Sequence, residues 1–250
     1  MRYAIVSDIH ANWQAWQAVI RDIRSIGVDC IICLGDVVGY GPHPAKVTRE
    51  VRENCENFVL GNHDAVVAGF LDPAIFNKGA RQIIQWTAKQ LDEEAVQFYA
   101  SLPMVLEAEN FICVHAEVAR PQRFGYIVKP EDARDSFAAA DRDLVFVGHT
   151  HKPGVFTLDP ETAAISLELS PEKYALRHDR RYIVNVGSVG DPRDGDMRSA
   201  YCLYDDSTKT ISIRRIPFDI RAYADDLEAA QLPMKPRFLF HLLAEEEAGG

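Results

Sequence analysis

The chain has 250 residues, of which 47% are hydrophobic and 26% charged, and its formal net charge is −10. This length and composition are typical of a globular protein with a sizeable core. The negative charge repels a phosphate backbone, so we expect no nucleic-acid polymer as a partner. An anionic substrate would therefore need a local source of positive charge.

The opening residues, MRYAIVSDIH, enter a strand pattern without the charged and long apolar segments of a signal peptide. No apolar run approaches the roughly 18 residues of a membrane span. The chain has five cysteines, an odd number, and most of them lie in or beside strand-like runs. This pattern is typical of reduced, buried thiols. We expect a cytoplasmic protein with no membrane partner and one domain over 1–250, while no pattern predicts an oligomeric state.

In the first half of the chain, short apolar runs alternate with helical patterns. The runs predict buried strands over 3–8, 28–36, 57–62, 111–116 and 144–149. The helical spacing predicts helices over 12–26, 43–54, 74–90, 92–100 and 130–140. Asn12 is the expected N-cap of the first helix and Gly27 its stop. The chain therefore starts as an α/β unit.

The second half is mostly β. Closely spaced strand patterns are joined by turn signals such as DPET and DDSTKT, which predict hairpins. Two packed sheets with helices on the outside accommodate both halves. The acidic tail, about 245–250, is expected to be solvated. Four apolar residues before it are expected to pack: Phe238, Leu239, Leu242 and Leu243.

Polar side chains that can bind metals follow five of the predicted strands, where α/β sheets place their ligands. These motif residues are Asp8, His10, Asp36, Asn62, His63, Asp64, His115, His149 and His151. Residues i and i+2 of an extended strand point to one side, so we expect Asp8 to pair with His10 and His149 with His151.

The set offers histidine nitrogen and carboxylate oxygen without thiolate. It suits Mn, Fe, Co, Ni or Zn better than Ca or an all-oxygen Mg site. Seven or eight ligands are too many for one tetrahedral zinc ion. They suit two divalent ions that share one carboxylate.

In order and content, the motifs resemble those of the calcineurin-like metallophosphoesterase superfamily. The family pattern D-x-H, G-D, G-N-H-[DE], a lone His and G-H-x-H is present as SDIH, LGDVVGYG, LGNHD, VHAE and VGHTH. The resemblance implies a four-layer α/β/β/α sandwich of two mixed sheets. The segment 185–196, NVGSVGDPRDGD, is similar to a loop of bacterial and archaeal members described as small phosphodiesterases or dinucleoside-tetraphosphate hydrolases.

The resemblance also implies a role for each motif residue. One metal ion would be held by Asp8, His10 and His151. The second would be held by Asn62, His115 and His149. Asp36 would bridge the two ions, and His63 would contact the scissile phosphate or protonate the leaving group. The two ions outweigh the charges of Asp8 and Asp36, which leaves a positive site in an acidic protein.

The implied function is hydrolysis of small phosphodiesters, phosphomonoesters or nucleotide phosphoanhydrides by attack of a metal-bridging hydroxide. The expected partner is a small phosphorylated substrate, because two long segments, 64–110 and 116–143, leave the sheets between ligand motifs. The helical part, about 64–100, is expected to overhang the site. Arg193 and Tyr40 are candidate substrate contacts, although Arg193 could instead pair with an acid of its own loop.

Two alternatives remain open: a protein phosphatase, and a non-catalytic scaffold of the same fold. Gly39 and Tyr40 stand where the protein-phosphatase branch has Asp and Arg, which disfavours the first. His63 is present, whereas scaffold members tend to lose this histidine. Asp64 could orient His63 or cap the helix that follows.

Overall fold

The computed structural model describes residues 1–232 and residue 239, and within them it contains two six-stranded sheets. The first sheet has the strand order β3 (Asn57–Phe58), β2 (Cys30–Cys33), β1 (Arg2–Val6), β11 (Ser199–Asp205), β12 (Thr210–Ile216) and β9 (Tyr174–Ala175). The second has the order β4 (Val105–Glu107), β5 (Ile112–Val114), β6 (Leu144–Val147), β10 (Arg181–Asn185), β7 (Gly154–Leu158) and β8 (Ile165–Leu169). The predicted acidic tail lies outside the described residues, as do Phe238, Leu242 and Leu243.

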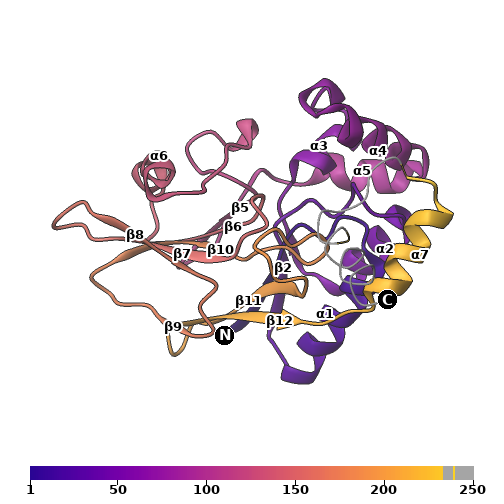
Figure 1. Cartoon of the computed structure of the whole chain (residues 1–250). Coiled ribbons are helices and arrows are strands. Elements are labelled where there is room, and N and C mark those ends of the chain that lie inside the picture. Colours follow the sequence, from indigo (N-terminus) through magenta and orange to yellow (C-terminus); the bar gives the residue numbers. More distant parts are fainter. Residues whose placement is uncertain (233–238, 240–250) are drawn as a thin grey trace.

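Helices cover the outer faces of the two sheets (Figure 1). The α-helices are α1 (Trp13–Ile26), α2 (Pro44–Asn54), α3 (Asn62–Val67), α4 (Lys78–Lys89), α5 (Glu93–Ser101), α6 (Arg134–Ala139) and α7 (Ile220–Ala229). Three 3₁₀ turns accompany them: η1 (Pro73–Ile75), η2 (Pro121–Arg123) and η3 (Pro130–Ala133). In Figure 1, α6 lies on one side of the sheets, and α1, α2 and α7 lie on the other.

The four layers follow from the alternation of side chains along each strand. Ala4 and Val6 of β1 face outward and pack with Trp16 of α1. Ile5 between them faces the second sheet and belongs to the core that contains Phe146 of β6. A third core joins the outer face of the second sheet to Phe137 of α6. The predicted four-layer α/β/β/α sandwich is therefore confirmed.

Local sequence signals predicted both ends of α1 correctly. The Asn12 side chain accepts a hydrogen bond from Ala15 N at 3.0 Å, and Gly27 ends the helix with φ +71°. Such caps satisfy backbone groups that the helix itself leaves unpaired. The predicted helix over 130–140 instead begins as the 3₁₀ turn η3 before it becomes α6. The predicted hairpins, β7–β8 and β11–β12, are confirmed as antiparallel pairs.

The strand directions bring the motif loops to one edge. β1 and β2 run parallel in the first sheet, and β5, β6 and β10 run parallel in the second. Their carboxyl ends consequently deliver the motif loops to the same region. No helix in the described part of the chain has the length and apolar character needed to span a bilayer. Leu239, expected to pack, is buried with Tyr223 and Leu227 of α7.

Candidate metal centre

The structure gathers the motif residues of distant loops into one buried cluster. Ligand atoms of histidines and aspartates lie within 4.8 Å of one another in three overlapping groups. The groups are Asp8–His10–His151, His10–Asp36–His63 and Asp36–His115–His149. Each of these side chains is buried. Asn62 is also buried, with its Oδ1 atom lacking a hydrogen-bond partner.

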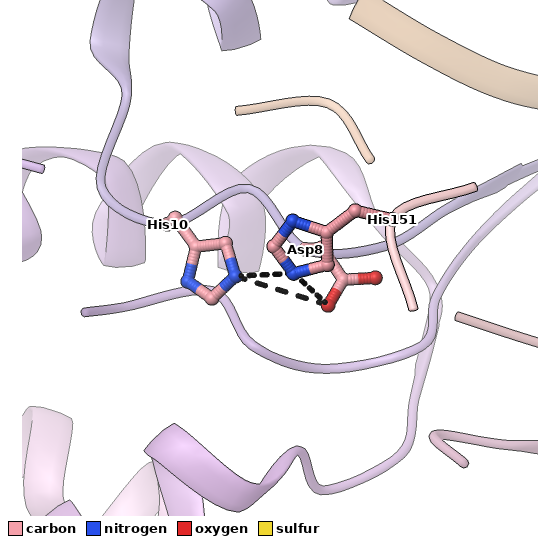
Figure 2. Close-up of side chains that lie close together, drawn as sticks. All are labelled: Asp8, His10 and His151. Atoms are coloured by element: carbon pink, nitrogen blue, oxygen red, sulfur yellow. Dashed lines mark hydrogen bonds and ion pairs between the residues drawn. The ribbon is translucent and has the colours of Figure 1, made fainter. Parts of the chain in front are cut away.

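The first group is shown in Figure 2, where two imidazole rings and one carboxylate point toward one another. Asp8 Oδ1 lies 3.2 Å from His151 Nε2 and 3.8 Å from His10 Nε2. The two Nε2 atoms are 3.1 Å apart. Asp8 Oδ2 is turned away and accepts a hydrogen bond from His149 N at 2.9 Å. One carboxylate oxygen is thus fixed by the backbone and the other is left facing the two rings.

Backbone carbonyls set the orientation of three histidine rings. The Nδ1 atom of His10 lies 3.1 Å from Val38 O, that of His115 lies 2.7 Å from Leu34 O, and that of His151 lies 2.5 Å from Asp191 O. A carbonyl oxygen only accepts, so each Nδ1 carries a proton that it donates. Each Nε2 then faces the interior of the cluster, the arrangement that outer hydrogen bonds give to metal-binding histidines.

Asp36 joins the second and third groups. Its Oδ2 atom lies 3.3 Å from His115 Nε2 and 3.9 Å from His10 Nε2. Its Oδ1 atom accepts a hydrogen bond from His63 N at 2.9 Å. His115 Nε2 is 3.1 Å from Nδ1 of His149, which closes the third group. Asp36 is therefore shared between two groups of candidate ligand atoms.

The electrostatics of the cluster favour a bound cation. Burial lowers the pKa of His10 and of His149 to about 3, so these rings are neutral. Burial alone would also lower the pKa of His115 and His151, but Asp36 and Asp8 raise each to about 9. The buried carboxylates thus require compensating positive charge. The donor set and the unpartnered Asp8 Oδ1 and Asn62 Oδ1 atoms fit divalent metal ions.

The ligand loops reach this geometry through left-handed backbone, which corrects the expectation of extended pairs. β1 ends at Val6 and β6 at Val147, so the motif residues lie beyond the strands. Five of them have φ between 50° and 67°: Asp8, His10, Asp36, His149 and His151. Asp8 and His10 share a group, but His149 and His151 fall in different groups. Such backbone costs about 1–3 kcal/mol per residue and is concentrated at functional sites.

The last residue of β10 and the segment after this strand hold the ligand loops in place, a role that sequence patterns did not predict. Asn185 Nδ2 donates to Gly148 O at 2.7 Å, and Ser188 Oγ donates to Asp8 O at 2.8 Å. A side chain at position 148 would collide with Ser7 and Asp8. The GHTH loop can therefore approach Asp8 only because position 148 is glycine.

His63 lies at the edge of the cluster, at the start of α3. It is buried, and its Nδ1 atom has no hydrogen-bond partner. Its ring packs against Phe76 with centroids 4.4 Å apart and against Tyr40 with centroids 4.8 Å apart. A side chain at position 39 would collide with Nδ1 of His63. The absence of a side chain at Gly39 thus provides the space that the imidazole ring of His63 occupies.

Asp64 does not contact His63 through its side chain in any described hydrogen bond. Its carboxylate accepts hydrogen bonds from Gly61 N at 3.3 Å, Val37 N at 3.4 Å and Val38 N at 3.3 Å. It lies at the third position of α3 and reaches back to the N-cap, as in a capping box. Burial and the nearby Asp36 raise the pKa of Asp64 to about 7. Asp64 joins the Asp36 loop to α3.

A cavity of about 240 Å³ opens above the cluster. Its lining residues are Asp36, Tyr40, Asn62, His63, Ile75, Phe76, Asn77, Ala80, Tyr126, His149, His151 and Arg193. Both overhanging segments contribute, the first at Ile75 and Phe76 and the second at Tyr126. The larger cavity, about 640 Å³, lies at the opposite strand ends and contains none of the motif residues.

Arg193 and Tyr40, the two predicted substrate contacts, line this cavity together. The Arg193 guanidinium is 5.4 Å from the centroid of the Tyr40 ring. The expected pairing of Arg193 with an acid of its own loop is confirmed, because it donates to Asp191 Oδ2 from Nε at 3.0 Å and from Nη2 at 2.7 Å. Asp191 was not predicted as a site residue, although it contacts both Arg193 and His151.

Comparisons with known proteins agree with this geometry. Residues 1–209 match the family model of the calcineurin-like phosphoesterase superfamily domain. The uncharacterized protein MJ0912 of Methanocaldococcus jannaschii is 37% identical over 235 residues, which are 92% of this chain and 93% of that protein. Phosphodiesterase YfcE of Escherichia coli K12 is 22% identical over 195 residues, which are 70% of this chain and 86% of YfcE.

Among solved structures, a metallophosphoesterase from Sphaerobacter thermophilus is similar, with a TM-score of 0.81 and 35% identity. The match covers 93% of this chain and 95% of that one. Family model, relative and structure all extend across the motif loops and both sheets. The chain therefore belongs to the calcineurin-like phosphoesterase superfamily and is a metal-dependent phosphoester hydrolase.

Proposed function

We propose that the protein hydrolyses small phosphodiesters, phosphomonoesters or nucleotide phosphoanhydrides with two divalent transition-metal ions. The observation that carries the proposal is the position of Asp36, whose Oδ2 atom lies 3.9 Å from Nε2 of His10 in the first group and 3.3 Å from Nε2 of His115 in the third. A single ion would leave one of these groups without compensating charge. Two ions about 3.5–4 Å apart are the arrangement that a bridging carboxylate serves.

The proposed ligand sets follow the groups. Asp8, His10 and His151 hold one ion, and Asn62, His115 and His149 hold the other. Asn62 belongs to the second set because its unpartnered Oδ1 atom lines the same cavity as His149. Nitrogen and oxygen donors without sulfur suit Mn, Fe, Zn, Ni or Co. When bound, such ions lower the pKa of a water molecule held between them and stabilise charge on phosphate oxygens.

The surrounding residues position the substrate and the transferred proton. His63 lines the cavity, where its imidazole ring can hydrogen-bond the phosphate or the leaving oxygen. Arg193 adds a fixed positive charge next to Tyr40, and this charge can bind a second phosphate group. The cavity, with walls from two separate segments, favours a small substrate over a polymer.

The local packing at Gly39 counts against the protein-phosphatase alternative. That branch requires an acidic side chain at this position, and here any side chain would collide with His63. The scaffold alternative predicts a protein without turnover. A measurement of hydrolytic activity, and not the geometry of the site, distinguishes this alternative from the proposed enzyme.

The test is hydrolysis of bis(p-nitrophenyl) phosphate by metal-free protein, with and without added Mn²⁺. We expect turnover that requires the metal and is lost in excess chelator. A screen with Mn²⁺-loaded protein then compares monoesters, diesters, cyclic nucleotides and dinucleoside polyphosphates with a phosphopeptide. Absence of turnover on every small ester would support the scaffold, and preference for the phosphopeptide would support the phosphatase.

A further inference from the structure

The mouth of the metal cavity carries exposed apolar side chains. Among the described residues, six large hydrophobic side chains are strongly exposed: Met1, Phe70, Ile75, Tyr126, Val128 and Leu169. Four of these six belong to the two overhanging segments, and Ile75 and Tyr126 line the cavity itself. Exposed apolar side chains that gather at a cavity are typical of a ligand contact, whereas single ones need no explanation.

Tyr126 lines the cavity and is 59% exposed. Its ring lies on the ring of His149, with centroids 4.2 Å apart and planes 30° from parallel. One face of the tyrosine is therefore covered by a proposed metal ligand. The exposure of the residue leaves the rest of the ring accessible at the cavity mouth.

The neighbours of Tyr126 fix its backbone on both sides. Phe124 is buried and packs against His115 with ring centroids 5.9 Å apart, while Ile127 is buried in the core that contains Phe137. Gly125 leaves no room for a side chain because the Glu117 carboxylate occupies that space. A large aromatic ring held by such anchors loses little conformational freedom when it binds a ligand.

The segment that carries Ile75 is held in place as well. Arg81 Nη2 donates to Ala74 O at 3.1 Å and to Phe76 O at 3.2 Å, which fixes the η1 turn. This turn presents Ile75, 56% exposed, and stacks Phe76 on His63. The cavity thus carries apolar side chains from two separate segments, while the candidate metal ligands at its floor and most of its lining are polar.

The cavity volume of about 240 Å³ encloses only part of a nucleotide-sized ligand, because complete ligand pockets span roughly 300–1,000 Å³. A phosphate on the floor would therefore leave the rest of its ester at the mouth, against Tyr126 and Ile75. Planar rings stack favourably on exposed tyrosine, and a nucleobase is the planar ring that phosphate esters carry.

We infer that Tyr126 is a specificity-determining residue that stacks on the nucleobase of a nucleoside phosphate, with Ile75 as a second apolar residue of the same cavity. The inference rests on the proposed function and narrows its substrates to nucleotides. Arg193, which lines the same cavity, is placed to bind a further phosphate of such a ligand.

The experiment compares adenosine 5′-monophosphate with ribose 5-phosphate as competitive inhibitors of chromogenic diester hydrolysis by Mn²⁺-loaded protein. The two differ only in the adenine. We expect the adenine to lower the inhibition constant about tenfold in the wild type, as stacking on one aromatic ring does. Tyr126→Ala should weaken inhibition by adenosine 5′-monophosphate and leave inhibition by ribose 5-phosphate unchanged, so that the difference disappears. Tyr126→Phe should retain the difference.

Leu169→Ala is the matched control, because Leu169 on β8 is 68% exposed and is not among the residues that line the cavity. Equal inhibition constants in the wild type would overturn the inference. An equal increase in the inhibition constants of both ligands in Tyr126→Ala would also overturn it, since this would indicate a general role of the loop. Calorimetric binding of the two ligands to the metal-loaded protein separates these results from failure of the proposed function, in which the diester is not hydrolysed at all.

Discussion

Asp191 contacts His151 twice, since its backbone carbonyl lies 2.5 Å from Nδ1 of the ring and its carboxylate lies 3.3 Å away. The Oδ2 atom of the same carboxylate accepts two hydrogen bonds from the Arg193 guanidinium. One buried aspartate therefore orients a proposed metal ligand and restrains a proposed phosphate contact. Outer partners of this kind are worth roughly 10–100-fold in metal affinity or activity.

We predict that Asp191→Ala lowers kcat/KM by about 10–100-fold and weakens metal retention. The backbone carbonyl remains, so the ring keeps one restraint, but Arg193 loses its partner. Asp196→Ala is the control, because Asp196 pairs with Arg198 in the same loop and contacts no motif residue in the described bonds. Metal content and steady-state kinetics of both variants check this prediction. Equal behaviour of the two variants would contradict it.

His63→Ala should retain metal and lose about 10²–10⁴-fold in kcat. The reason is that the His63 ring lines the cavity beside Asp36, in position for a proton or hydrogen-bond role. The geometric group His10–Asp36–His63 offers the opposite possibility, that His63 is itself a ligand. Elemental analysis decides between them, because loss of metal from the variant would show that His63 is a ligand.

Gly39→Ala should reproduce part of the His63→Ala defect, since the added methyl group would displace the imidazole. Gly195→Ala is a close control for backbone strain. The two glycines have φ of +91° and +92°, but a side chain at position 195 meets nothing within 4 Å. We expect similar losses of thermal stability in the two variants and a loss of kcat in Gly39→Ala alone. Unchanged kcat in Gly39→Ala would argue against a role for this contact.

Arg193→Ala should raise KM more for a dinucleoside polyphosphate than for a simple aryl phosphate. Only the polyphosphate offers the guanidinium a second charged group. Arg198→Ala provides the comparison, because this neighbouring arginine is exposed and pairs with Asp196. KM values for the two substrates in each variant check the prediction. A proportional increase for both substrates would assign Arg193 to the scissile phosphate or to the fold instead.

The sequence predicted the layers and the ligand types because both depend on local signals. Apolar runs that end in Asp8, Asp36 and His115 mark the strand ends, and Asn12 with Gly27 marks the limits of α1. The two-residue strand β9 was beyond such signals, since only its pairing with β12 defines it, whereas β3 begins the apolar run predicted over 57–62. α7 was also missed, and its buried face is clear only once the sheets exist.

Within the site, the unpredicted features depend on long-range contacts. Asp8 and His151 have left-handed backbone because their loops meet across the two sheets. The residue types at these positions do not predict this conformation. Ser188 and Asp191 matter through contacts to residues about 40 to 180 positions away. Tyr126 lies in an irregular segment without periodicity. Its role follows only from the buried residues on either side of it.

The central claim is a pair of metal ions bridged by Asp36, and anomalous diffraction from Mn²⁺-loaded crystals tests it most directly. We predict two anomalous peaks about 3.5–4 Å apart. One should lie beside Asp8, His10 and His151, the other beside Asn62, His115 and His149, with an Asp36 oxygen within bonding distance of each. A single peak, or two peaks without Asp36 between them, would contradict the claim.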